Sequence, residues 1–223
     1  MKITATLLLP ALCLLAFPLF TQADVLFFDG FEDDAVGSGN TLDNWTQSDT
    51  TRVYAVNSTS HTGANSLFMR HSGTRSLTQI NAIDITGTSG LLVSWWMMQG
   101  TDDQESNESF IFSMDFGSGM QTVLTDKGEA DGGVFNYSGT ELNNPTDTGK
   151  ATSFVKYSVS IDSSYYLGDL EATAVKLKFY NQTGSNNENL YIDDISITAV
   201  PEPTAVTLLV IGFAALMICR RKN

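Results

Sequence analysis

Apolar and polar residues alternate one by one along much of the chain, and this alternation restricts the fold more than any other feature. In Val155–Ile161, every second residue is apolar and the residues between them are Lys or Ser. Phe110–Phe116 and Val175–Tyr180 follow the same pattern. Successive side chains of a strand point to opposite faces, so these segments are predicted to be half-buried β-strands.

Other segments rich in β-branched and aromatic residues extend this pattern along the chain. They are Val25–Phe28, Arg52–Val56, Ser66–Arg70, Leu77–Ile80, Leu91–Met98, Gln121–Leu124, Val134–Tyr137 and Leu190–Thr198. Turn-forming clusters such as Gly37–Asn40 separate them, and no long amphipathic helix is evident. About eleven short strands in one domain predict an all-β fold, an antiparallel sandwich of two sheets.

The N-terminal segment differs from this strand pattern. Lys2 precedes an apolar run, Ile3–Phe20, and the small residues Thr21 and Ala23 follow it. This order is typical of a secretory signal peptide, which signal peptidase would cleave after Ala23. An uncleaved membrane anchor is the alternative. We therefore predict a signal peptide over residues 1–23 and a folded domain over residues 24–199.

The C-terminal segment, residues 200–223, also has three parts. They are the motif Pro201-Glu202-Pro203, an apolar run over about residues 204–219, and a basic cluster of Arg220, Arg221 and Lys222 in the tail 220–223. The apolar run is short for a bilayer, but snorkelling and local thinning can compensate. We predict a single transmembrane helix whose basic tail stays in the cytoplasm, which places the domain outside.

These three parts, in this order, resemble the PEP-CTERM sorting tail of Gram-negative bacteria, although the resemblance covers only the last two dozen residues. An ordinary single-pass anchor is the alternative. The resemblance implies recognition by an exosortase, with cleavage near the Pro-Glu-Pro motif. It also implies export across the inner membrane, transient anchoring, and a final place at the cell surface or in a biofilm matrix with exopolysaccharide.

Charge and cysteine content exclude several functions. The whole chain has a formal charge of −13, and residues 24–199 keep 8 basic and 24 acidic residues, a charge of −16. Phosphate attraction needs a basic surface, so nucleic-acid binding is not expected. Cys13 and Cys219 both lie in the apolar ends. The domain therefore has no disulfide, no thiolate metal site and no cysteine nucleophile.

Five short motifs of the domain carry a second resemblance. They are Phe28–Glu32, Trp45, His61–Leu67, Leu91–Trp96 and Tyr191–Ile197. In this order they resemble the jelly-roll sandwiches of MAM-like domains and of many carbohydrate-binding modules. The resemblance spans nearly the whole domain, but each motif is short, and it implies a fold more than a function.

The same resemblance implies a structural calcium ion near the meeting point of the first and last strands. The matching carboxylates are Glu32, Asp193 and Asp194, and Asp29 and Asp33 are near enough in sequence to contribute. Calcium prefers six to eight oxygen ligands, which carbonyls of a nearby turn could complete. Adjacent residues of a strand point to opposite faces, so only one of Asp193 and Asp194 is expected to ligate.

Two alternatives apply to the acidic residues. The carboxylates of the last strand could instead form an acidic edge that discourages pairing with another sheet. The densest acidic run, residues 101–108, lacks the spacing of an EF-hand loop and is interpreted as a solvated loop rather than a second cation site.

A glycan-binding surface is the second candidate site. If Trp95 faces the core, Trp96 faces outward, where an aromatic ring can stack on a sugar. Lys176, Lys178 and Tyr180 are the candidate neighbours that would contact sugar hydroxyls. The alternative is that both tryptophans are buried.

Catalytic motifs are not found in the sequence. There is no nucleophile elbow, zincin pattern or phosphate loop, and His61 and His71 lie in or beside turn-rich stretches without an assignable partner. Both histidines are expected at the surface. We predict an exported, non-catalytic surface or matrix protein. A calcium-dependent carbohydrate-binding module is the alternative, and a glycan-active hydrolase or lyase is a third hypothesis.

Overall fold

The computed structural model describes residues 23–70, 73–99, 109–127, 134–135, 141–142, 153–162, 172–184 and 188–201. Within them the regular structure consists of strands alone. The strands are β1 (Val25–Asp29), β2 (Trp45–Gln47), β3 (Val53–Val56), β4 (Ser66–Arg70), β5 (Gly73–Gln79), β6 (Ile83–Asp84), β7 (Thr88–Gln99), β8 (Ser109–Asp115), β9 (Met120–Lys127), β10 (Val134–Phe135), β11 (Glu141–Leu142), β12 (Val155–Asp162), β13 (Ala174–Thr183) and β14 (Asn189–Pro201).

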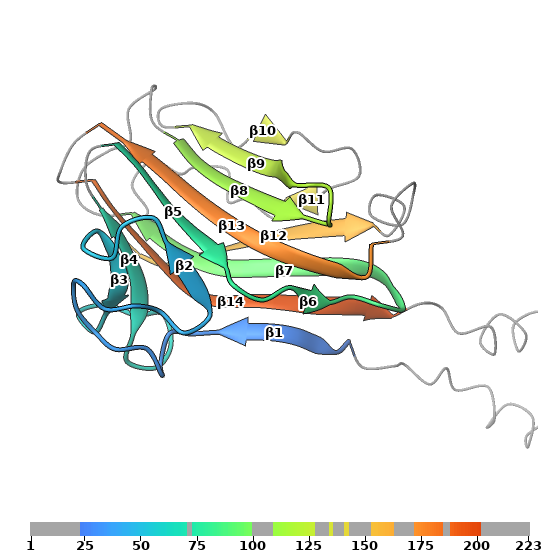
Figure 1. Cartoon of the computed structure of the whole chain (residues 1–223), viewed down its shortest axis with the longest axis horizontal. Coiled ribbons are helices and arrows are strands. Elements are labelled where there is room, and N and C mark those ends of the chain that lie inside the picture. Colours follow the sequence, from blue (N-terminus) through green and yellow to red (C-terminus); the bar gives the residue numbers. More distant parts are fainter. Residues whose placement is uncertain are drawn as a thin grey trace, which may run out of the picture.

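These strands form two antiparallel sheets of seven strands each (Figure 1). The first has the order β11-β12-β7-β14-β4-β3, and β1 also pairs with β14; we call it the β14 sheet. The second has the order β10-β9-β8-β13-β5-β2, and β6 also pairs with β13; we call it the β13 sheet. The prediction of a two-sheet antiparallel jelly-roll β-sandwich is confirmed.

Each segment predicted to be a strand overlaps a strand of the structure. The strands that the sequence pattern missed, β2, β6 and β11, have only two or three residues. A period of two cannot be recognised in so short a segment, so pairing with a neighbouring strand decides that these residues are extended.

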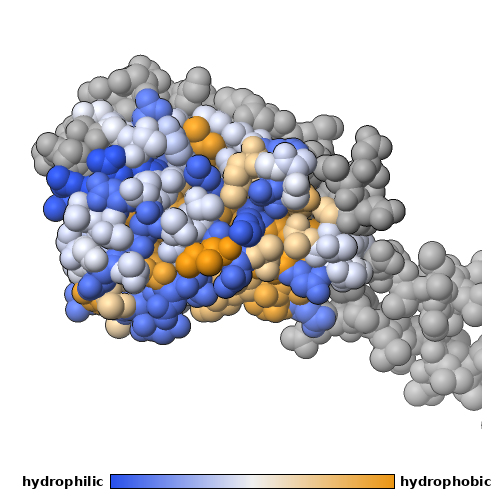
Figure 2. Space-filling view, in the orientation of Figure 1, coloured by the Kyte–Doolittle hydropathy of each residue, from blue (hydrophilic) through white to orange (hydrophobic). Residues whose placement is uncertain are grey.

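Trp95 lies at the centre of the core and joins the two sheets. Its ring centroid is 5.8 Å from that of Tyr157 in the β14 sheet, and 4.9 Å from Phe112 and 5.5 Å from Phe179 in the β13 sheet. Aromatic pairs of this kind contribute about 0.5–1.5 kcal/mol each beyond the area they bury. Hydrophilic and neutral residues cover most of the face shown in Figure 2, with small apolar patches between them.

Strand β14 is where the first strand of the domain meets β4. Residues 189–192 pair with β4 and residues 195–198 pair with β1, which lies alongside β14 in Figure 1. Asp193 and Asp194 fall between these partners, where the register with β7 shifts and Asp194 has a φ of 47°. The strict alternation is lost at such a bulge. The expectation that the two carboxylates point to opposite faces is therefore wrong, because both reach the same loop.

Several predictions fall outside the described residues. They concern the signal peptide up to residue 22, the apolar run at about 204–219, the basic tail, the acidic run 101–108 and His71. In the part of the chain that the structure describes, no helix has the length and hydrophobicity needed to cross a membrane. Strand β14 extends to Pro201, so the Pro-Glu-Pro motif begins at the end of the last strand.

Candidate functional site

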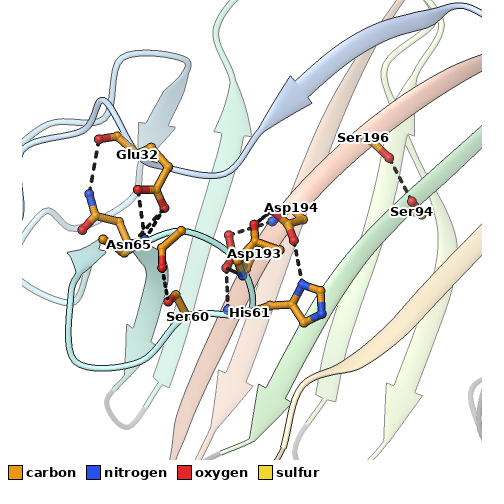
Figure 3. A network of polar contacts seen from close by, with 11 residues as sticks. Glu32, Ser60, His61, Asn65, Ser94, Asp193, Asp194 and Ser196 are labelled. Carbon is orange, nitrogen blue, oxygen red and sulfur yellow. Dashed lines mark hydrogen bonds and ion pairs between the residues drawn. The ribbon is translucent and has the colours of Figure 1, made fainter.

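The loop between β3 and β4, residues 57–65, is held by carboxylates from distant parts of the chain (Figure 3). Asp193 is fully buried, and its Oδ2 accepts the backbone N–H groups of His61 at 2.7 Å and Thr62 at 3.2 Å. Its Oδ1 accepts the N–H of Asp194 at 2.8 Å. One side chain thus satisfies three backbone donors, a buried one at Asp194 and two part-buried ones in the loop.

Asp194 binds side chains of the same loop. The hydroxyl of Thr62 donates to Oδ1 at 2.6 Å, and Nδ1 of His61 lies 2.7 Å from Oδ2. Hydrogen bonds to a carboxylate are stronger than those between neutral groups, so this pair fixes the orientation of the His61 ring.

Glu32 holds the other end of the loop. It accepts the N–H of Ala64 at 2.9 Å and the N–H of Asn65 at 2.9 Å, and the side-chain amide of Asn65 donates to the carbonyl of Phe31 at 3.2 Å. Gly63 has a φ of 60°, and a Cβ there would overlap the Glu32 carboxylate. Only glycine fits this close approach without strain.

The surroundings of Asp193 shift the pKa of its carboxyl group. Burial raises the pKa of this carboxyl from 3.8 to about 6, while the N–H groups of His61 and Asp194 act in the opposite direction. The negative charge of Asp194 raises it further. In the folded protein, the charged form of Asp193 is therefore less favourable than in the unfolded chain.

The sequence-predicted calcium ligands thus act as hydrogen-bond acceptors in the structure. Glu32, Asp193 and Asp194 come together around the β3–β4 loop. The Asp29 carboxylate has other partners: it accepts the N–H of Phe31 at 2.8 Å, the indole N–H of Trp45 at 2.7 Å and the side-chain amide of Asn44 at 3.1 Å.

His61 covers Trp96 on the outer face of the β14 sheet. The two rings are stacked, with centroids 3.6 Å apart and an angle of 14° between their planes. Phe154 meets the His61 ring edge-on at 5.9 Å. Sequence reasoning missed this arrangement, since it expected His61 to be a surface residue without a partner. No local pattern could reveal it, because the His61 loop reaches Trp96 only through its contacts with β14.

A row of side chains crosses the same outer face. Tyr54 pairs with Phe68, Phe68 with Tyr191, and Tyr191 with Met98, on the adjacent strands β3, β4, β14 and β7. The ring centroids are 5.4 Å apart for Tyr54–Phe68 and 5.1 Å apart for Phe68–Tyr191. Each of these residues alternates with core residues of its strand. We call the surface at Tyr54, Phe68, Tyr191 and Trp96 the aromatic face; within it Tyr54 and Tyr191 are half-buried, Phe68 is buried, and the His61 ring is stacked on Trp96.

Basic groups flank the aromatic face. The Arg70 guanidinium lies 5.7 Å from the centre of the Phe68 ring, close enough for a cation–π interaction. Lys156 is exposed and pairs with Trp96 across β12 and β7. Burial raises the pKa of the Tyr191 phenol, with a further contribution from Tyr54. The arrangement combines aromatic rings with hydrogen-bond donors, which is what recognition of a sugar requires.

Lys176, Lys178 and Tyr180 lie on the opposite side of the sandwich from Trp96. They belong to β13, where they alternate with the core residues Val175, Leu177 and Phe179. Their side chains therefore project from the outer face of the β13 sheet, which we call the lysine face. The structure therefore does not bring Trp96 together with these three residues. Alternation can predict that a residue lies on an outer face, but it does not specify which sheet that face belongs to.

No protein-family model matches the chain, and no curated protein sequence matches it. Among solved structures, a cyclase from Fischerella sp. TAU in complex with 4-(1H-indol-3-yl)butan-2-one has a TM-score of 0.53 and 13% identity, covering 80% of this chain and 98% of that chain. The carbohydrate-binding module CBM61 in complex with β-1,4-galactotriose has a TM-score of 0.47 and 13% identity, covering 76% and 94%.

A third neighbour is the CBM22-1 xylan-binding domain of Xyn10C from Paenibacillus barcinonensis. Its TM-score is 0.43 at 14% identity, and the match covers 80% of this chain and 96% of that chain. The structural neighbours thus include carbohydrate-binding modules. At these identities the likeness concerns the fold alone and assigns no ligand to this chain.

Proposed function

We propose that the chain is an exported, non-catalytic protein that binds polysaccharide on its aromatic face. The observation that carries this proposal is the row formed by Tyr54, Phe68 and Tyr191, whose rings contact one another across three adjacent strands. Neighbouring strands lie about 4.8 Å apart, so the row extends over roughly 10 Å. Phe68, in the middle of the row, is buried, so a sugar chain would stack its apolar faces on the half-buried rings of Tyr54 and Tyr191 at the two ends of the row.

Polar groups beside the rings would orient the sugar. Tyr54 and Tyr191 are half-buried and each carries a hydroxyl, and the Arg70 side chain lies over the Phe68 ring between them. A guanidinium and two phenols supply several donors for sugar hydroxyls, and Arg70 would also attract the carboxylate of an acidic sugar.

The β3–β4 loop supports this proposal by fixing one end of the face. The carboxylates of Asp193 and Asp194 hold His61 against Trp96 before any ligand binds. A site that is already ordered loses less conformational entropy on binding. The loop contacts therefore serve binding rather than chemistry in this proposal, and no catalytic residue is assigned.

We also propose that signal peptidase and an exosortase process the chain, as the two ends suggest. The mature domain would then remain at the cell surface or in the matrix with exopolysaccharide. Mass spectrometry of protein released from the producing bacterium tests this step. The proposal predicts a C-terminus near Pro201-Glu202-Pro203, and a released protein that keeps Arg220–Asn223 would contradict it.

The binding proposal is tested by affinity gel electrophoresis of the full chain in a panel of polysaccharides. The panel includes galactan, xylan, an acidic polysaccharide and the exopolysaccharide of the producing bacterium. Wild-type protein should be retarded by at least one of them. Tyr191→Ala should weaken that binding at least tenfold, whereas the matched variant Tyr180→Ala on the lysine face should change it less than twofold. Absence of retardation in every gel would overturn the proposal.

A further inference from the structure

Three aspartates that the β3–β4 loop does not use lie close together where β1 ends. One carboxylate oxygen from each of Asp29, Asp33 and Asp34 lies within 4.8 Å of those of the other two. The turn that brings them together passes through Phe31, whose φ is 58°. Asp29 and Asp34 are buried, while Asp33 is exposed, so the cluster is open on one side.

Asp34 has an oxygen without a partner. Only 6% of this residue is exposed, and its Oδ1 accepts the N–H of Asp43 at 2.7 Å. Its Oδ2 is also buried but has no hydrogen-bond partner. A buried carboxylate oxygen that receives neither a hydrogen bond nor a cation is strongly unfavourable, so this atom points to a ligand that satisfies it.

Charge leads to the same conclusion. Within the described residues, no lysine, arginine or histidine forms an ion pair with Asp29, Asp33 or Asp34. The nearest carboxylate oxygens of the three residues lie within 4.8 Å of one another. Like charges this close need a compensating positive charge to coexist at neutral pH.

We propose that Asp29, Asp33 and Asp34 bind a divalent cation of the calcium class. The donors are all carboxylate oxygens, which hard cations prefer, and the exposed side of the cluster leaves room for water ligands. Asp29 Oδ1 accepts one hydrogen bond, from the N–H of Phe31, so a lone pair remains for the ion. Asp29 and Asp33 were named in the sequence analysis as able to contribute to a calcium site, whereas Asp34 was not, and Glu32, Asp193 and Asp194 are not part of this cluster.

The cation would connect the end of β1 to the segment that leads into β2. Asp29 already holds the indole of Trp45, and Asp34 already holds the backbone of Asp43. An ion bound to both carboxylates would fix these two contacts relative to each other. The role is structural and does not depend on whether the aromatic face binds a glycan.

The test is calcium titration of the chelator-treated full chain, followed by isothermal calorimetry and by thermal melts. Wild-type protein should bind calcium, and its melting temperature should rise by roughly 3–8 °C at saturating ion, because a ligand that binds only the folded state stabilises it. Asp33→Asn changes an exposed residue and should keep the fold, but should weaken calcium binding at least tenfold. Asp84→Asn removes an exposed carboxylate elsewhere and should bind calcium within twofold of wild type.

Three results would overturn the assignment. The first is a wild-type protein with neither binding heat nor a shift in melting temperature at millimolar calcium. The second is equal binding by Asp33→Asn and Asp84→Asn, which would place the ion elsewhere. The third is calcium binding that survives Asp34→Asn but is lost in Asp193→Asn, which would place the ion at the β3–β4 loop.

Discussion

The two outer faces of the sandwich arise from the same alternation of residues, yet they have different chemistry. On the aromatic face, the strand register places Phe68 between Tyr54 and Tyr191. On the lysine face, the register places Lys178 between Thr78 and Ser113. What a strand presents to solvent therefore depends less on its own sequence than on the residues that its neighbours place beside it.

The two faces also differ in how they are fixed. The aromatic face carries the β3–β4 loop, which three carboxylates hold by hydrogen bonds. On the lysine face, the hydroxyls of Thr74 and Tyr180 lie 3.0 Å apart in an exposed hydrogen bond. Exposed hydrogen bonds exchange readily with water and contribute less than buried ones. We therefore expect substitutions to have larger effects on the aromatic face.

Asp193→Ala should have the largest effect. The substitution leaves three backbone N–H groups without their acceptor, including those of His61 and Thr62. The free energy of unfolding should fall by about 2–4 kcal/mol in urea denaturation. Lys178→Ala on the lysine face should change it by less than about 0.5 kcal/mol. Equal stability of the two variants would remove the contrast between the faces.

The titration of Asp193 should make the free energy of unfolding depend on pH. Its pKa is raised to about 6 in the folded protein, so the folded state binds more protons than the unfolded state between about pH 4 and pH 6. Stability in chelator should therefore fall as the pH rises through this range, and Asp34 should add to the fall. A shift of about two units corresponds to roughly 3 kcal/mol at most.

Asp193→Asn removes the titrating group but keeps an acceptor oxygen. Urea denaturation at several pH values should show a shallower decline for this variant than for wild type. The comparison of slopes, rather than of absolute stabilities, isolates the effect of the titration. Identical slopes would mean that Asp193 ionises equally easily in both states.

Gly63→Ala should destabilise the loop by about 1–3 kcal/mol. The added Cβ would overlap the Glu32 carboxylate, and the backbone has a positive φ. Gly87→Ala is the matched control, since Gly87 has a φ of 75° but nothing within 4 Å of the added atom. Both variants carry the backbone strain, so the difference between their unfolding free energies measures the contact with Glu32. A difference near zero would show that the loop adjusts freely.

The stacking of His61 on Trp96 should give the smallest effect. A double-mutant cycle of His61→Ala and Trp96→Ala should yield a coupling of about 0.5–1.5 kcal/mol, as expected for packed rings. The corresponding cycle for Thr74 and Tyr180 on the lysine face should yield less than about 0.5 kcal/mol. A larger coupling on the lysine face would reverse the comparison.

The sequence was sufficient to predict the sandwich because long strands such as β12 and β13 have a clear period of two. The sequence left open whether Trp96 faces outward or is buried like Trp95; in the structure Trp95 is buried and Trp96 is partly exposed. It could not assign Trp96 and Lys178 to different sheets, because strand order depends on pairing between distant segments. For the same reason, the row of Tyr54, Phe68 and Tyr191 was missed.

The carboxylates show a second limit of sequence reasoning. The resemblance implied that Glu32 and Asp193 are calcium ligands. In the structure they accept hydrogen bonds from backbone N–H groups of a loop, which have no signature in the sequence. The sequence does not reveal the bulge at Asp194, which lets the carboxylates of both Asp193 and Asp194 reach that loop. Asp34 was overlooked because its burial and its unpartnered oxygen appear only in three dimensions.

The most direct test of the account is a comparison of two double variants in binding to the polysaccharide that retards the wild-type protein most. Calorimetric titration would be carried out with Tyr54→Ala/Tyr191→Ala on the aromatic face and with Lys176→Ala/Lys178→Ala on the lysine face. The account predicts that the first variant keeps its fold but loses measurable binding, while the second binds within about twofold of wild type. Loss of binding in the lysine variant, with full binding in the tyrosine variant, would contradict it.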